Sequence, residues 1–151
     1  MIGSKQPTGT YLSPEDAAEH CKKGASIWEF ASTDNGKEPD VVIVGIGVEV
    51  TFEVVKAAEI LKDWLPELRV RVVNVTDLMV LAAESRHPHA LSRAAFLDMF
   101  TEDKAICFNY HGYCAELQGL LFGRPGLHRM TVEGYKEEGS TTTPFDMMLQ
   151  N

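Results

Sequence analysis

The chain has 151 residues, 44% of them hydrophobic and 24% charged, a composition typical of one globular domain and not of a disordered or low-complexity segment. Fourteen Lys and Arg residues stand against 22 Asp and Glu residues, so the net charge is −8, which argues against broad binding to nucleic acid or to an anionic membrane. Three cysteines without paired spacing predict no disulfide. With no secretory signal at the polar N-terminus, we expect a soluble cytoplasmic protein.

The N-terminal segment divides into an arm and the start of the first helix. Residues 1–12 carry no apolar period, which predicts an extended arm outside the core, and the domain proper is expected to span residues 13–151. Ser13, followed by a proline and two acids, is typical of a helix start. Despite Gly24, apolar residues at near-helical spacing predict a helix that ends before the turn-rich segment 32–36.

Strand and helix patterns alternate from residue 40 onward. The β-branched run 40–47 predicts a strand buried on both faces of a parallel sheet. Apolar steps of three and four residues over 49–65 predict a helix that Pro66 ends. Residues 69–75 form the next predicted strand, with Asp77 placed to cap the element after it.

The same alternation continues through the second half of the chain. We expect a short helix over 91–100, a strand over 105–110, a loop at 111–113, a helix over 114–122 and a strand over 130–134. Short connections between alternating strands and helices predict an α/β fold, built as a three-layer α/β/α structure with a mostly parallel, doubly wound sheet.

The end of the chain indicates a further helix. Thr143 is a capping hydroxyl before Pro144, and Asp146 follows within the first turn. Only about two helical turns remain before Asn151, too few for an independently stable helix. We therefore expect the domain to be truncated at its C-terminal end.

A glycine pair follows the first buried strand. Gly45 and Gly47 resemble the opening of a dinucleotide-binding fingerprint, but Val50 occupies the third glycine position and Glu49 would repel a phosphate. We favour a tight turn that lets the following helix pack on the sheet.

Two cysteines and a histidine could form a nucleophilic site. Cys107, Asn109 and His111 share one strand face, and Cys114 follows near a helix start, where a thiolate would be stabilised. We favour buried, apolar cysteines over a Cys-His nucleophile, while His111 stays a candidate because ligands bind beyond the carboxyl ends of such strands. No paired spacing among these residues or the loop histidines predicts a metal site.

The tract 133–144 combines glycines, an acidic pair and four consecutive hydroxyl residues. Its hydroxyls and free N–H groups could bind an anion, or the tract could be a capped surface loop. Residues alone leave both interpretations open.

Several motifs together resemble one enzyme family. Lys5-Gln6-Pro7 follows a glycine and a serine and resembles a GKQP linker, residues 27–32 resemble IWEWAS, and residues 73–78 resemble VNV-DL. The most specific segment is GYKEEGSTTTPFDM at 134–147. Over nearly its whole length the chain is similar to the C-terminal part of xylulose 5-phosphate/fructose 6-phosphate phosphoketolase.

This resemblance implies a transketolase C-terminal-like domain of an enzyme that cleaves a ketose phosphate with phosphate, giving acetyl phosphate and an aldose phosphate. It implies that Lys5 contacts the sugar phosphate and that His111-Gly112-Tyr113 has a structural or interface role. Thiamine diphosphate and Mg²⁺ would be held by upstream domains, so this chain is expected to bind no cofactor or metal and to carry no catalytic residue. Its partners would be the remaining domains and a second subunit, and the isolated chain would be inactive.

Two other hypotheses remain. One is a free-standing α/β regulatory domain that binds a nucleotide or a phosphometabolite beyond the strand ends. The other is a small hydrolase that uses Cys114 and His111, which requires a lowered thiol pKa.

Overall fold

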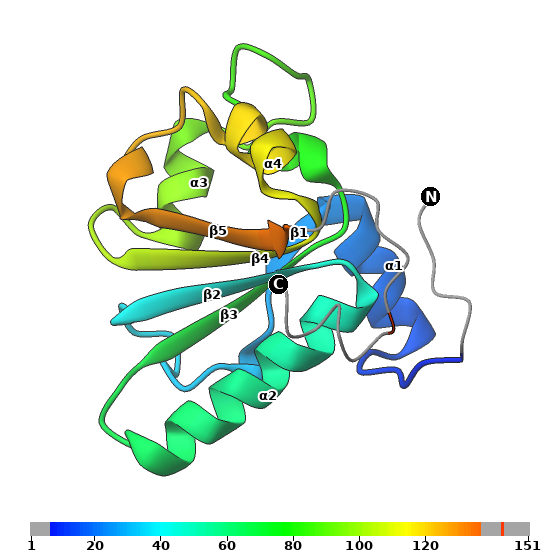
Figure 1. Ribbon diagram of the computed structural model, residues 1–151, viewed down its shortest axis with the longest axis vertical. Helices are drawn as coiled ribbons and strands as arrows, with labels where there is room; N and C mark the ends of the chain where they lie inside the picture. Colours follow the sequence, from blue (N-terminus) through cyan, green and yellow to red (C-terminus); the bar gives the residue numbers. More distant parts are fainter. Residues whose placement is uncertain (1–6, 137–142, 144–151) are drawn as a thin grey trace.

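The computed structural model describes residues 7–136 and 143, which form a five-stranded sheet flanked by helices (Figure 1). The strands are β1 (Ala25–Ile27), β2 (Val41–Ile46), β3 (Val70–Val75), β4 (Ala105–Tyr113) and β5 (Met130–Tyr135). The helices are α1 (Pro14–Lys23), α2 (Val48–Trp64), α3 (Arg93–Phe100) and α4 (Cys114–Leu121), with short 3-10 turns η1 (Glu29–Ala31), η2 (Leu78–Leu81) and η3 (Leu127–Arg129).

The sheet has the strand order β1-β3-β2-β4-β5. Strands β3, β2, β4 and β5 are parallel, and β1 pairs antiparallel with β3 at one edge. The chain passes through α2 from β2 to β3, then returns across the sheet to β4 on the other side of β2. Strands β2 and β4 therefore flank the point where the winding reverses, which confirms the predicted mostly parallel, doubly wound α/β sheet.

Helices cover both faces of the sheet, α2 on one side and α3 with α4 on the other (Figure 1). Alternate residues of β2 pack against these two helix layers. Ile43 packs in the cluster that contains Val54 of α2, whereas Val44 belongs to the cluster with Phe96 and Phe108. Both of these rings are fully buried, and each such burial stabilises the fold by about 1.5–3 kcal/mol.

Side-chain caps fix where several elements begin. The Ser13 hydroxyl accepts the main-chain N–H three residues later at 3.1 Å, and Ser92 does the same for α3 at 3.1 Å. Asp77 accepts the N–H two residues on at 2.9 Å, which confirms its predicted capping role. These bonds satisfy N–H groups that have no partner within their own helix.

The first helix is shorter than predicted. It ends at Lys23 because Gly24 adopts the left-handed conformation, with φ of 73°. A Cβ at Gly24 would lie 2.6 Å from Val80 Cγ1, so the position also needs glycine for space. Residues 25–27 leave the helix as β1, a strand that the helical spacing hid, and Trp28 is buried beyond it.

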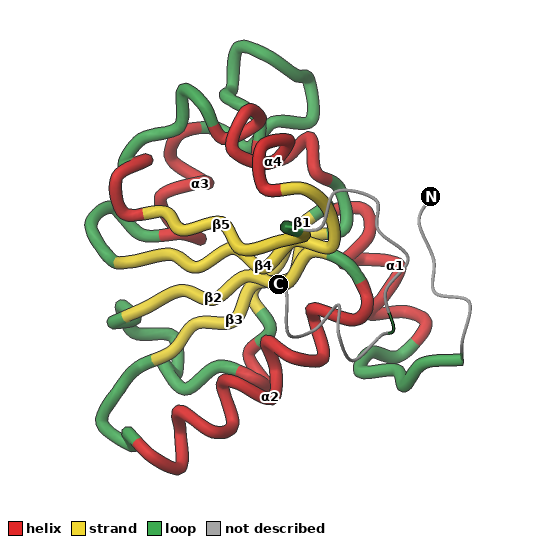
Figure 2. The backbone as a smooth tube through the Cα atoms, viewed as in Figure 1, coloured by secondary structure: helices red, strands yellow, loops and turns green. Residues whose placement is uncertain are grey.

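The second half of the chain departs from prediction at residues 111–113, which belong to β4 and not to a loop. Figure 2 shows β4 running directly into α4. The pairing of β4 with β5 shifts register between Asn109 and Tyr113 and ends with Tyr113 opposite Tyr135. Because glycines are common where strand pairing is irregular, the glycine at position 112 resembled a loop signal in the sequence.

Parts of two other predictions fall on described residues. The arm has no helix or strand over residues 7–12, but Leu12 packs against the core cluster of Trp28, which corrects the expectation that the arm lies wholly outside the core. The predicted helix after Thr143 lies outside the described residues.

Candidate functional site

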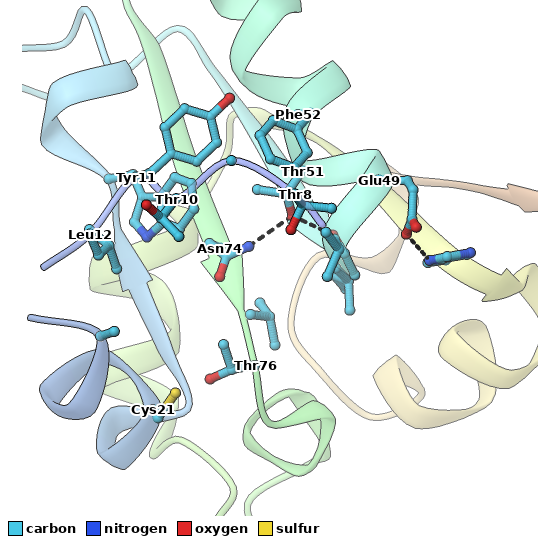
Figure 3. A pocket seen from close by; sticks show the side chains of 18 of the residues that line it. Thr8, Thr10, Tyr11, Leu12, Cys21, Glu49, Thr51, Phe52, Asn74 and Thr76 are labelled. Atoms are coloured by element: carbon cyan, nitrogen blue, oxygen red, sulfur yellow. Dashed lines mark hydrogen bonds and ion pairs between the residues drawn. The ribbon is translucent and has the colours of Figure 1, made fainter. Parts of the chain in front are cut away.

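A cavity of about 840 Å³ lies beyond the carboxyl ends of β2, β3 and β4 (Figure 3). This is the edge of a doubly wound sheet where ligands bind, because the reversal of winding separates the loops that would otherwise cover it. The arm supplies one wall through Thr8–Leu12, and the sheet and α2 supply the others. Its further lining residues include Trp28, Gly47, Glu49, Thr51, Phe52, Asn74, Thr76 and His111.

The first turn of α2 lines this cavity and contains a carboxylate, Glu49. Glu49 Oε2 lies 2.9 Å from His111 Nδ1 at the end of β4, and Figure 3 shows this contact at the cavity rim. A carboxylate in the first turn of a helix is stabilised by the helix dipole. The same carboxylate opposes an incoming phosphate, so the arrangement does not fit a dinucleotide pyrophosphate.

Gly47 is required by this arrangement. It is the N-cap of α2 with φ of 110° and ψ of 159°, a conformation that is almost restricted to glycine. A Cβ at this position would collide with the side chain of His111. The Gly45-Gly47 pair therefore serves the tight turn and close packing that the sequence favours over a nucleotide fingerprint.

A chain of buried and part-buried hydrogen bonds supports the cavity floor and links five elements. Asn74 Nδ2 donates to Thr51 Oγ1 at 2.9 Å and to the main-chain oxygen of Gly45 at 3.1 Å. Asn74 Oδ1 faces His20 Nε2 at 2.7 Å, and His20 Nδ1 faces Ser26 Oγ at 2.6 Å. Because Asn74 Oδ1 only accepts, His20 donates to it from Nε2.

Three other aromatic rings surround Tyr11 of the arm. Its ring centroid lies 5.5 Å from that of Trp28, 5.6 Å from that of Phe30 and 5.1 Å from that of Phe52. Phe52 comes from α2 and the other two from the segment after β1. Centroid distances of this size are typical of favourable aromatic pairs. Tyr11, Trp28 and Phe52 also line the cavity, so it has an aromatic wall.

His111 pairs with Glu49, and the two cysteines near it have other neighbours. Cys107 and Asn109 share a face of β4, with Asn109 Nδ2 3.8 Å from the Cys107 sulfur. Burial and the nearby Glu133 carboxylate raise the pKa of the Cys107 thiol, which lowers its thiolate fraction. Cys114 packs instead toward β5, where a Cβ on residue 134 would lie 3.3 Å from its sulfur. The interpretation of these cysteines as packing residues is favoured.

Several predicted site residues cannot be placed on this cavity. Lys5 lies outside the described residues, as does most of the hydroxyl tract. Between residues 7 and 136, no group of three or more His, Cys, Asp and Glu side chains could hold a metal ion. His89 is exposed and pairs with Asp77 at 2.9 Å.

No helix of the described chain is long and apolar enough to cross a membrane.

The sequence did not predict the contacts of Tyr11 or the hydrogen bonds of Asn74 at the cavity floor. Tyr11 stands in an arm without periodicity, and nothing in that segment indicates which side chain returns to the domain. Asn74 lies inside a valine-rich strand, and a single polar residue in a buried strand was the signal that it has hydrogen-bond partners.

The fold and the cavity define an α/β domain of the doubly wound class with a cavity at the switch point. Over residues 5–151 the chain matches the family described as the XFP C-terminal domain. It belongs to this family, the C-terminal domain of phosphoketolases.

Curated relatives agree with this assignment. The chain is 60% identical over 151 residues to a probable phosphoketolase of Schizosaccharomyces pombe, covering 100% of this chain and 18% of the relative. It is 49% identical over 152 residues to a probable phosphoketolase of Chlorobaculum tepidum and 46% identical over 151 residues to probable phosphoketolase 2 of Nostoc, covering 100% of this chain and 19% of each relative. The chain thus spans less than a fifth of their length.

Proposed function

We propose that this chain acts as the C-terminal domain of a cytoplasmic phosphoketolase that uses thiamine diphosphate and Mg²⁺. The complete enzyme cleaves xylulose 5-phosphate or fructose 6-phosphate with inorganic phosphate, giving acetyl phosphate and an aldose phosphate. In it, this domain packs against the remaining domains and a second subunit, and Lys5 contacts the phosphate of the sugar. The chain alone is inactive.

The observation that carries this proposal is the family match over residues 5–151, which includes Lys5. A lysine ammonium is a compact point charge suited to a sugar phosphate. Nothing among the described residues competes for that role at the cavity, since the first turn of α2 presents Glu49. The cation that meets the substrate is therefore assigned to the arm.

The described residues do not fit the cofactor itself. Thiamine diphosphate needs a cation bound to carboxylate and carbonyl oxygens beside the diphosphate, and residues 7–136 offer no such cluster. Glu49 at the cavity would repel the diphosphate. The proposal accordingly assigns the cofactor, which supplies the carbanion chemistry when bound, to domains outside this chain.

Exposed apolar side chains support a role in packing against other domains. Trp64 at the end of α2 is 79% exposed, and Phe122 after α4 is 62% exposed. Helices α2 and α4, at whose ends these residues stand, cover opposite faces of the sheet (Figure 1). Aromatic side chains are enriched at protein interfaces.

A chimera tests the proposal. This chain replaces the matching 151 residues of the Schizosaccharomyces pombe protein, and acetyl phosphate is measured with fructose 6-phosphate or xylulose 5-phosphate plus phosphate. We expect activity from the chimera and none from the 151-residue chain. In the chimera, Lys5→Ala should raise the KM for the sugar phosphate roughly 10- to 100-fold. Activity of the chain alone, or an unchanged KM in Lys5→Ala, would contradict the proposal.

The cavity supports a second role in binding a small regulatory molecule. Its volume of about 840 Å³ lies within the range of ligand sites, and its aromatic wall suits a ligand with a flat apolar part. Titration calorimetry of the chain with nucleotides and phosphosugars distinguishes the two roles. A saturable heat signal supports regulation, and its absence removes that role while leaving the first intact.

A further inference from the structure

The carboxylates that line the cavity beyond the strand ends give it a negative character. Glu49 and Asp77 both line it, and among the described residues around it there is no lysine or arginine. The side chain of Glu49 is 52% exposed and that of Asp77 is 33% exposed, so solvent reaches both. Because opposite charges attract over a few ångströms even near a protein surface, this lining favours a cation over an anion.

The start of α2 does not reverse this preference. A helix N-terminus is equivalent to roughly +0.5 elementary charge, whereas an ionised Glu49 in the first turn contributes a full negative charge. Glu49 lies 2.9 Å from His111, but a neutral imidazole leaves the charge of the carboxylate in place, and a carboxylate can accept from several donors at once. The net charge of −8 adds an effect of the same sign at longer range.

Aromatic rings lie one helical turn away from this carboxylate. Residues three apart share a face of a helix, so Phe52 stands beside Glu49 on α2, and both line the cavity. Figure 3 shows the rings of Tyr11 and Phe52 side by side, with their centroids 5.1 Å apart. Trp28 continues the same wall. The faces of these three ring types attract cations, and their apolar bodies pack against a flat ligand.

We propose that this cavity binds an organic cation with a flat ring, whose charge lies beside Glu49 and whose ring packs against Phe52 and Tyr11. The cavity volume of about 840 Å³ is sufficient for such a ligand. The inference rests on the second role proposed above in that it uses the same cavity. It assigns a different class of ligand, one without phosphate, because a phosphate would meet the two carboxylates as like charges.

Two probes with the same ring and different charge test this class, benzyltrimethylammonium and benzyl alcohol. The ammonium group has no proton to lose, so its charge is fixed at any pH. Binding of each probe to the complete chimeric enzyme is measured by titration calorimetry. We expect benzyltrimethylammonium to bind about tenfold more tightly than benzyl alcohol, since it gains both the carboxylate and the ring faces.

Matched variants locate the bound cation. Glu49→Gln should weaken binding of the cation about three- to fivefold and leave that of the alcohol within about twofold. Glu53→Gln removes the same charge from the next turn of α2, at an exposed residue outside the cavity lining, and should leave the affinity for the cation within about twofold. Phe52→Leu should weaken binding of the cation about two- to fivefold, whereas Phe122→Leu after α4 should not. Thermal unfolding checks that each variant is folded.

The outcomes separate the inference from the proposed function. Equal affinity for the two probes, or a loss in Glu49→Gln no larger than in Glu53→Gln, overturns the inference. Binding of neither probe also overturns it, and a saturable signal from a nucleotide or phosphosugar would then leave the second role in place without it. A cation preference that depends on Glu49 and Phe52 supports the inference. The first role is measured independently by the formation of acetyl phosphate.

Discussion

The substitution Gly47→Ala tests the packing of the switch point most directly. Gly47 combines a backbone conformation that is almost restricted to glycine with a neighbouring side chain, His111, where a Cβ would lie. The strained backbone costs about 1–3 kcal/mol, and displacement of the histidine costs about 1–2 kcal/mol of overpacking. Alanine recovers about 0.5 kcal/mol through the entropy of the unfolded chain. The expected loss in the free energy of unfolding is therefore about 3 kcal/mol.

The His111 share of this loss can be isolated. In a His111→Gly background the colliding Cβ of residue 111 is absent, so Gly47→Ala should cost only the backbone share, about 1–2 kcal/mol. His111→Gly by itself removes a largely solvated pair with Glu49, whose side chain is 52% exposed, and places a glycine in a strand, so it should cost about 1–2 kcal/mol. Urea unfolding of the parent, both single variants and the double variant measures these values.

Equal costs of Gly47→Ala in the two backgrounds would refute this role of His111. Independent sites add within about 0.3–0.5 kcal/mol, so a coupling below that size would show that His111 does not fill the space beside Gly47. Thermal unfolding provides a second check, because about 3 kcal/mol corresponds to about 6–12 °C in Tm for a chain of this length.

Three further predictions concern other charged and thiol groups. Arg124 donates to three main-chain oxygens at 2.8–3.0 Å, and Arg124→Lys should cost about 2–4 kcal/mol in urea unfolding, whereas Arg86→Lys on the surface should cost under about 0.5 kcal/mol. Bonds from Arg69 hold the pKa of Asp40 at about 2, so Asp40 stabilises the fold above the unfolded pKa, near 4, and loses that effect as pH falls toward 2. The stability gap between the parent and Asp40→Asn should therefore shrink over that window, and a constant gap would contradict it. Iodoacetamide at pH 8 should label exposed Cys21 before Cys107, whose thiol pKa is raised, and mass spectrometry of early time points would show the reverse order if this is wrong.

The regular part of the fold was predictable because its signals are local and repeated. Valine runs and helical steps each recur over several residues, so β2, α2 and β3 appear within a residue or two of their predicted bounds. The error at β1 has a different cause. Its three residues continue a helical spacing, but the helix ends because Gly24 adopts the left-handed conformation, which is a common helix stop. The pairing of residues 25–27 with β3 joins segments far apart in sequence, so local pattern could not supply the strand.

The candidate site was predictable only in part, for a related reason. The position of the cavity follows from the order of strands, and His111 was expected at a strand end. The role of His111 follows from Gly47 and Glu49, two residues on another element. Tyr11 depends on contacts with three rings from two other segments, which no spacing rule connects.

The charge at the switch point distinguishes this domain from doubly wound domains that bind phosphate at the same place. Folds that bind phosphate at a helix N-terminus keep that terminus free of carboxylates and surround it with glycine. Here Glu49 occupies the first turn of α2 and lies 2.9 Å from His111, so a carboxylate of the domain itself already stands at the positive end of the helix dipole. With a net charge of −8, the chain also repels anionic ligands at long range. Both effects oppose phosphate binding at this helix end, which the type of sheet alone would have suggested.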